Sequence, residues 1–89
     1  MPKQDLVTEW IEPDPYKPWE GDARIRDTGV HVWALIGYLP AVHDDPARVA
    51  ADYELPIEAV EAAIAYYRRH RHAIDARLAM NAAYDTGPS

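Results

Sequence analysis

The sequence predicts a mainly α-helical fold in which two short β-strands precede three helices, the last of them long. Three observations support this prediction. Apolar residues recur at helical spacing from residue 30 onward. The runs that favour strands lie before residue 27. Pro46 and Pro56 each stand where a helix can begin, because proline suits the first turn.

Two extended runs are predicted in the first third of the chain. Residues 6–12 are rich in β-branched and aromatic side chains and roughly alternate in polarity, which predicts a short strand. Prolines at positions 13, 15 and 18 then exclude both a helix and a strand ladder. Residues 23–26 form the second run, which ends at the turn Asp27-Thr28-Gly29. The two runs can pair, although two strands alone are of marginal stability.

The first two helices have clear limits. The first helix begins at Val30, and Pro40 closes it. We expect Trp33 to pack in the core beneath this helix. The second helix covers residues 46–53 and follows Asp45, whose carboxylate suits an N-cap. The apolar face of the first helix comprises Val32, Leu35, Ile36 and Leu39.

The third helix begins at Pro56 and meets no clear stop before Gly87-Pro88. Glu58 and Glu61 lie in its first turns, where negative charge favours the helix dipole. A helix longer than about 25 residues in so small a domain must pack on something outside the monomer or bend. If the helix bends, the bend should lie near Arg71.

The second and third helices fit a helix-turn-helix layout, because only Glu54 and Leu55 join them. Plain packing of a short helical hairpin buries similar residues, so this alternative stays open. The predicted core of the motif comprises Val49, Ala50, Tyr53, Leu55, Val60 and Ile64.

Length and composition limit the class of protein. The 89 residues, of 10.1 kDa, suffice for one small domain, which would gain stability from a second copy, so we expect a homodimer. The net charge of −6 argues against strong non-specific binding of nucleic acid. No apolar run approaches the ~18 residues of a membrane helix, and the first residues lack a signal-peptide pattern. We therefore expect a cytoplasmic protein that does not enter the membrane.

Three segments are predicted along the chain. Residues 1–22 form an N-terminal strand and a proline-rich arm, residues 23–84 form the helix-turn-helix domain, and residues 85–89 form a flexible tail. Within the domain, the segment 68–77 holds four arginines and one aspartate, so its net charge is plus 3. A plain interpretation of this basic patch is a solvated helix face that benefits from the helix dipole.

Three stretches resemble the domain-of-unknown-function 433 family. They are residues 24–33, 48–53 and 56–67, and the resemblance extends over about residues 6–72. The resemblance implies a homeodomain-like three-helix fold that follows short strands, and a dimer. It also implies an antitoxin-like interaction protein that binds and silences a PIN-like ribonuclease toxin, and that represses its own promoter.

Nucleic-acid contacts are expected from Arg24, Arg26 and Thr28, next to or within the first turn. The family pattern in this turn is glycine-threonine-arginine, where this chain has Asp27-Thr28-Gly29, so one basic group is missing. Glu58 and Glu61 would also repel phosphate from the supposed recognition helix. A stand-alone DNA-binding transcriptional regulator is the alternative function.

Contacts with a protein partner are expected from two groups of residues. Because a guanidinium binds carboxylates bidentately, one of Arg68, Arg69 and Arg71 could reach the carboxylates that hold metal in a PIN-like toxin. The aromatic residues of the arm are candidates for an interface, although they could instead pack the arm onto the body. These aromatic residues are Trp10, Tyr16 and Trp19.

Catalysis is not expected, and the sequence predicts no metal site and no cofactor. The chain has no cysteine, and it lacks a phosphate-binding glycine loop. Asp45 of the fragment His43-Asp44-Asp45 is already explained as a helix cap. His70 and His72 are two residues apart, so a helix points them in different directions and they cannot chelate one ion together.

Overall fold

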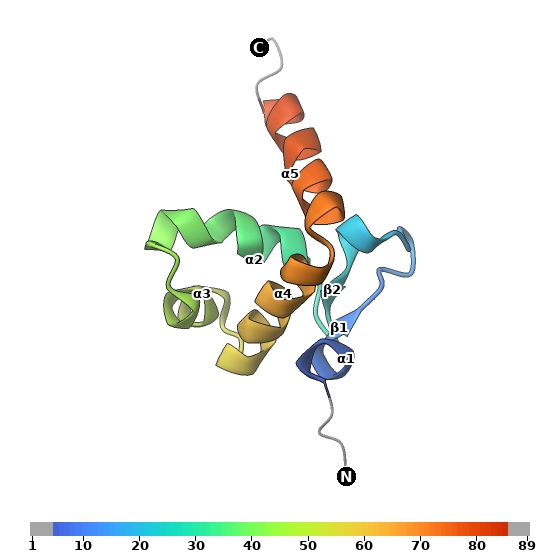
Figure 1. Ribbon diagram of the computed structural model, residues 1–89. Coiled ribbons are helices and arrows are strands. Elements are labelled where there is room, and N and C mark those ends of the chain that lie inside the picture. The colour runs from blue at the N-terminus through green and yellow to red at the C-terminus, as the bar shows by residue number, and fades with distance from the viewer. Residues whose placement is uncertain (1–4, 86–89) are drawn as a thin grey trace.

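The computed structural model describes residues 5–85 as helices around one core, with a small two-stranded sheet (Figure 1). This confirms the predicted mainly helical class with a short sheet. Within residues 5–85, no helix is both long and apolar enough to cross a bilayer. The elements are α1 (Leu6–Trp10), β1 (Ile11–Glu12), η1 (Glu20–Asp22), β2 (Arg24–Ile25), α2 (Val32–Tyr38), η2 (Leu39–Val42), α3 (Pro46–Tyr53), α4 (Ile57–Arg69) and α5 (Arg71–Asp85), η denoting a 3-10 helix.

The first element is a helix, so the prediction of a strand over residues 6–12 was largely wrong. Residues 6–10 form α1, and only Ile11–Glu12 is extended. The carboxylate of Asp5 accepts a hydrogen bond from the backbone N–H of Val7 and so caps the helix. Local capping therefore outweighed the β-propensity of the run, which is a weak guide on its own.

Arg26 stabilises the other end of α1 from a distant part of the chain. Its guanidinium donates hydrogen bonds to the backbone carbonyls of Thr8 and Glu9, each at 3.1 Å, and to that of Ile11 at 3.3 Å. The last carbonyls of a helix have no partner within the helix. Arg26 supplies this partner, so α1 depends on a contact that its own sequence does not reveal.

Replacing Arg26 with alanine is expected to lower the free energy of unfolding by about 1–2 kcal/mol, because three carbonyl contacts are lost. Urea denaturation followed by circular dichroism measures this change. The control is Arg48→Ala, which removes an exposed arginine paired with Asp52 four residues away and should cost at most about 0.5 kcal/mol. Equal losses in the two variants would contradict the capping role.

The two strands pair as predicted, over fewer residues than expected. Ile11 lies opposite Ile25, and Glu12 lies opposite Arg24, in antiparallel register. Both isoleucines are buried in the core, whereas the Arg24 and Glu12 side chains form an ion pair at 2.8 Å on the same ladder. The sheet thus ties α1 to the segment that leads into α2.

The second predicted helix agrees with the structure at both ends. α3 covers Pro46–Tyr53, and the Asp45 carboxylate accepts a hydrogen bond from the backbone N–H of Ala47. Glu54 takes a left-handed conformation, with φ of 55°, and ends the helix. The first predicted helix is shorter than expected, because a 3-10 turn follows α2 from Leu39.

The prediction of one continuous third helix is wrong, because the helix is interrupted at His70. α4 ends at Arg69 and α5 begins at Arg71. The imidazole of His70 stacks on the ring of Tyr66, and its Nδ1 lies 3.1 Å from a carboxylate oxygen of Glu20. Of the two alternatives, a bend near Arg71 is present, and Glu20 of the N-terminal arm contacts it.

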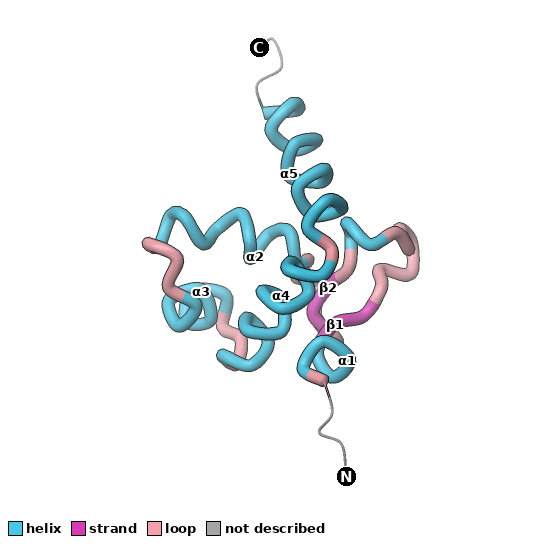
Figure 2. The backbone as a smooth tube through the Cα atoms, viewed as in Figure 1, coloured by secondary structure: helices cyan, strands magenta, loops and turns pink. Residues whose placement is uncertain are grey.

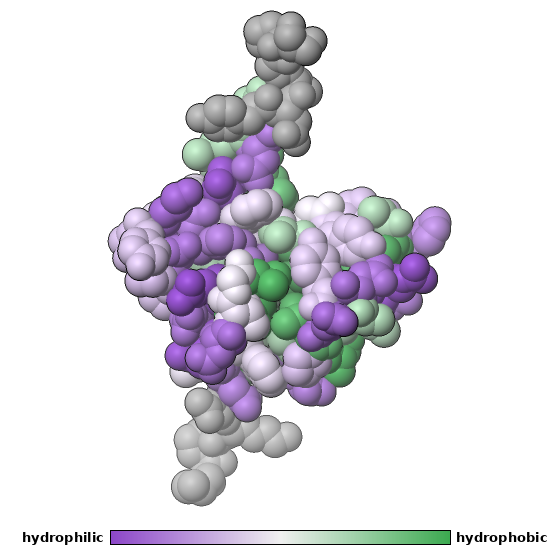
Figure 3. All heavy atoms as spheres, turned by 180° about the vertical axis from the view of Figure 1, so that it is seen from behind, coloured by the Kyte–Doolittle hydropathy of each residue, from purple (hydrophilic) through white to green (hydrophobic). Residues whose placement is uncertain are grey.

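α4 is the central helix of the core. It contacts α1, α2 and α3, which lie around it in Figure 2. Its small residues Ala59, Ala62 and Ala63 are fully buried, which lets these neighbours approach closely. On the face seen from behind, apolar side chains reach the surface between polar rims (Figure 3). α5 leaves this globule and extends away from it (Figure 1).

The predicted core residues lie where they were expected. Val49, Ala50 and Val60 are buried, and Trp33 packs half-buried against the core. The three remaining residues of the predicted motif core are half-buried and pack against it; they are Tyr53, Leu55 and Ile64.

Candidate protein-binding surface

The three residues expected to contact nucleic acid are engaged within the chain itself. Arg24 pairs with Glu12, and Arg26 binds the carbonyls at the end of α1. The hydroxyl of Thr28 donates a hydrogen bond of 2.8 Å to the carbonyl of Ile25 and so closes the turn. These side chains shape the fold around the strands.

The first turns of the supposed recognition helix α4 are acidic. Glu58 and Glu61 are both exposed in its first turns. α1 contacts this helix as well, which the sequence did not indicate. Exposed carboxylates repel phosphate, so this surface does not favour base contacts.

The aromatic residues of the arm differ in their availability. Tyr16 is 90% exposed, whereas Trp19 is 40% exposed and Trp10 is half-buried against the core. The indole N–H of Trp19 donates a hydrogen bond to Asp22, and its ring lies over Gly21 where no Cβ would fit. Tyr16 is therefore the most accessible of the three.

The arm is fastened to the body at both ends. Asp14 is buried, accepts a hydrogen bond from the backbone N–H of Tyr16 and contacts Nε2 of His31 at 3.0 Å. The hydroxyl of Tyr66 donates a 2.8 Å hydrogen bond to the carbonyl of Glu20. Burial raises the pKa of Tyr66 to about 12, so this hydroxyl remains a donor.

A buried ion pair joins the arm to α5. Nε of Arg77 lies 2.9 Å from Oδ1 of Asp22, and these side chains are 15% and 5% exposed. The Arg77 guanidinium also lies 5.2 Å from the ring centre of Trp33. Burial alone would raise the pKa of Asp22, but the hydrogen bonds from Trp19 and Arg77 outweigh it and the pKa is lowered.

Because its pKa is lowered on folding, Asp22 contributes stability above its unfolded pKa of about 4. That contribution is lost as the pH falls through the lower pKa of the folded state. We expect the free energy of unfolding to fall between pH 5 and pH 2.5, as measured by urea denaturation. In the Asp22→Asn variant the free energy of unfolding should fall less steeply with pH. The same pH dependence as in the parent protein would contradict this role.

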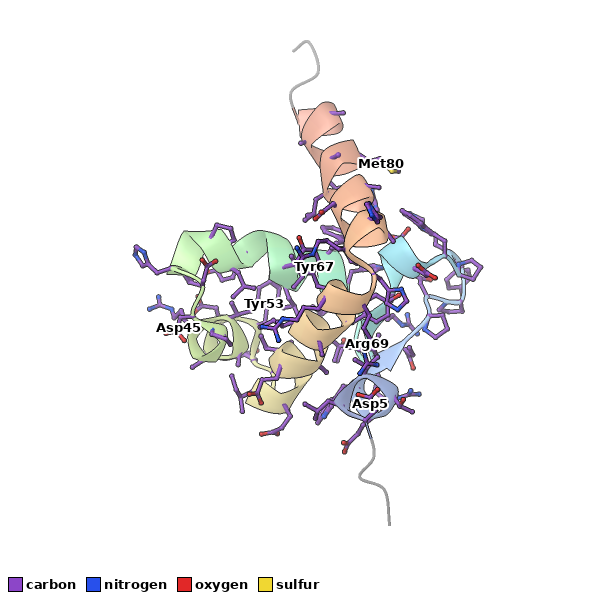
Figure 4. The ribbon with its side chains drawn as sticks, in the orientation of Figure 1. Asp5, Asp45, Tyr53, Tyr67, Arg69 and Met80 are labelled. Atoms are coloured by element: carbon purple, nitrogen blue, oxygen red, sulfur yellow. The ribbon has the colours of Figure 1, made fainter. Side chains whose placement is uncertain are left out.

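The three arginines of the basic cluster have different surroundings. Arg69 is paired with Asp5 at 2.6 Å, so it joins the end of α4 to the start of α1 (Figure 4). The hydrogen bond from Arg69 holds the pKa of Asp5 below its usual value. Arg68 and Arg71 are exposed, and neither has a carboxylate partner within residues 5–85.

Tyr67 positions one of these two arginines. The Arg71 guanidinium lies 5.4 Å from the centre of the Tyr67 ring, and the Tyr67 hydroxyl donates a 2.8 Å hydrogen bond to Asp75. That hydrogen bond raises the pKa of Tyr67 and fixes its ring. Tyr67 lies near the junction of α4 and α5 (Figure 4).

A surface groove of about 420 Å³ runs beside Arg68 and Arg71. Its lining comes from α2, η2, the loop before α3, α3, α4 and the first residue of α5, and we call it the arginine groove. The sequence predicted three partner-binding arginines, Arg68, Arg69 and Arg71, but not the apolar surface beside two of them. The available signal was the spacing of residues 64, 67 and 68, which share one side of α4. The groove is lined by Ile36, Leu39, Pro40, Asp44, Pro46, Ile64, Tyr67, Arg68 and Arg71.

Comparison with known proteins identifies a family. The family model described as "Protein of unknown function (DUF433)" matches residues 18–67, from the proline-rich arm to Tyr67. No curated protein and no solved structure matches the chain. The matched segment is more than half of the 89 residues and includes β2, the helices α2 and α3, and most of α4. The chain therefore belongs to the DUF433 family.

Proposed function

We propose that this protein is an antitoxin-like interaction protein that binds and inhibits a PIN-like ribonuclease. The family resemblance suggests the class, and one observation supports it most strongly. Arg68 and Arg71 are exposed and free of carboxylate partners beside an apolar groove. A PIN-like ribonuclease holds its metal in a ring of carboxylates, which guanidinium groups bind bidentately. The protein would act by binding rather than by catalysis.

The proposal includes a homodimer with a homeodomain-like helix-turn-helix of α2, α3 and α4. The turn between α3 and α4 is closed by the left-handed Glu54. α5 extends beyond the globule, and Met80 on it is 48% exposed, so this helix is one candidate interface. The edges of the two-stranded sheet are the other candidate.

The alternative is a stand-alone DNA-binding regulator. A regulator of this kind binds its promoter alone, and its affinity falls steeply with salt. Arg24, Arg26 and Thr28 are occupied by internal contacts, and Glu58 and Glu61 are exposed on α4. These contacts favour the interaction protein, with promoter DNA bound only in complex with the ribonuclease.

Mild affinity purification of the tagged protein from its native host tests the proposed function. Mass spectrometry after nuclease treatment should find a small PIN-like ribonuclease in stoichiometric amount. Light scattering of the protein alone should give twice 10.1 kDa. If only the protein itself is retained, the ribonuclease partner is wrong, and promoter DNA becomes the next candidate.

A further inference from the structure

We infer that the arginine groove is a docking site for an acidic amphipathic helix of a partner protein, with a large apolar side chain next to carboxylates. This inference deepens the proposed function and rests on it, since the helix is assigned to the inhibited ribonuclease. It differs from insertion of one arginine into a metal site, because the apolar surface and both arginines act together.

The charge of the occupant follows from the arginines of the chain. Within residues 5–85, five of the seven arginines have a carboxylate partner, and Arg68 and Arg71 do not. The chain as a whole has a net charge of −6, so these two guanidinium groups are a local exception. Complementary charge at an interface gives specificity and register. The occupant should therefore supply carboxylates.

The apolar part of the occupant follows from the lining of the groove. Ile36, Leu39 and Ile64 are apolar, and the ring of Tyr67 completes the same surface. A groove with an apolar floor and a few polar groups binds an apolar side chain and fixes its orientation with the polar ones. A carboxylate alone would leave the apolar floor exposed to water, so an amphipathic occupant fits better.

The two prolines of the groove favour a helix over an extended strand. Pro40 and Pro46 line the groove, and proline has no N–H with which to extend a strand ladder. An amphipathic helix instead binds a groove through side chains at helical spacing. Asp44 also lines the groove, and its charge repels carboxylates there. The acidic side of the helix should therefore lie against Arg68 and Arg71.

The positioning of Arg71 lowers the cost of binding. Its guanidinium lies over the ring of Tyr67, which is itself held by Asp75. A side chain that is already ordered loses less conformational freedom on association. Arg71 is thus presented to a partner before the partner arrives.

Selection of helical peptides from a randomised display library on the immobilised full-length protein tests this inference. Selected peptides should contain Asp or Glu together with Leu, Ile, Phe or Trp three or four residues apart. A selected peptide should bind the Arg68→Ala/Arg71→Ala variant about tenfold more weakly or worse. Arg48→Ala, which removes an exposed arginine outside the groove, should bind it like the parent protein.

Leu39→Ser provides a second variant, because it reduces the apolar surface without changing charge, and circular dichroism checks that it folds. It should bind the same peptide at least fivefold more weakly, since one side of the floor is lost. Selected peptides without acidic enrichment, or equal binding to the double arginine variant, would overturn the inference.

The failure of this inference differs from the failure of the proposed function. In one outcome, the protein inhibits the ribonuclease but the selected peptides bind equally well without Arg68 and Arg71. The groove is then not the docking site, and the proposed function stands. In the other outcome, acidic peptides bind only when both arginines are present, but the protein inhibits no ribonuclease. The groove is then a docking site, and the ribonuclease is not the source of the helix.

Discussion

Replacing Arg77 with methionine is expected to lower the free energy of unfolding by about 3 kcal/mol. The substitution leaves the Asp22 carboxylate, 5% exposed, without its cationic partner. It also removes the guanidinium from the face of Trp33 and from Asn81. A small domain has a total stability of about 5–15 kcal/mol, so the loss is large. Urea denaturation followed by circular dichroism measures it.

Two controls test whether the buried pair causes this loss. Arg48→Met makes the same substitution at an exposed arginine and should lower the free energy of unfolding by at most about 0.5 kcal/mol. Arg77→Met combined with Asp22→Leu should recover part of the loss, because no unpaired charge then stays buried. If the double variant is less stable than Arg77→Met alone, the unpaired carboxylate is not the cause.

Replacing Arg68 and Arg71 with alanine is expected to weaken the proposed complex with a PIN-like ribonuclease about 100-fold or more. Neither guanidinium has a carboxylate partner within residues 5–85, although that of Arg71 lies over the Tyr67 ring, so their loss breaks no ion pair of the chain. The thermal midpoint should stay near that of the parent protein. Isothermal titration calorimetry measures the affinity.

Arg69→Ala is the matched control for this prediction. Arg69 lies in the same cluster, but its guanidinium is held by Asp5 and helps to fasten α1. We expect a smaller loss of affinity than in the double variant. If Arg69→Ala weakens the complex about 100-fold and the double variant leaves the affinity unchanged, the arginine groove is not the contact surface.

The sequence predicted correctly those elements whose first and last residues are determined by their neighbours along the chain. α3 is the best example, because Asp45 caps it and Pro46 begins it, and both signals are local. The two extended runs were expected to be able to pair from their composition, and they do so over two residues each. α1 was missed because the side chain that holds its end belongs to Arg26, beyond the proline-rich arm.

The break between α4 and α5 shows the same limit. The apolar pattern continues past residue 70 to Ile74 and Leu78, so the sequence predicted one long helix that packs outside the monomer or bends near Arg71. The break lies where His70 meets Glu20, and the Arg77–Asp22 pair then holds α5 against the arm. Both contacts join residues about 50 positions apart, which periodicity along one helix cannot reveal.

The candidate site was predicted in part. Arg68, Arg69 and Arg71 were all expected as partner-binding residues because of their type and clustering. The difference between Arg69 and the other two depends on Asp5, which lies 64 residues away. The apolar floor was predicted as core, since Ile36, Leu39 and Ile64 follow helical spacing. Their partial opening to the surface depends on how η2 and α4 pack.

Titration of the ribonuclease with this protein tests the central claim most directly. Cleavage of a fluorescent RNA by the co-purified PIN-like ribonuclease is measured as the protein is added. The account predicts that cleavage stops near equimolar amounts, and that the Arg68→Ala/Arg71→Ala variant needs a large excess. Full cleavage in the presence of excess parent protein would contradict the account.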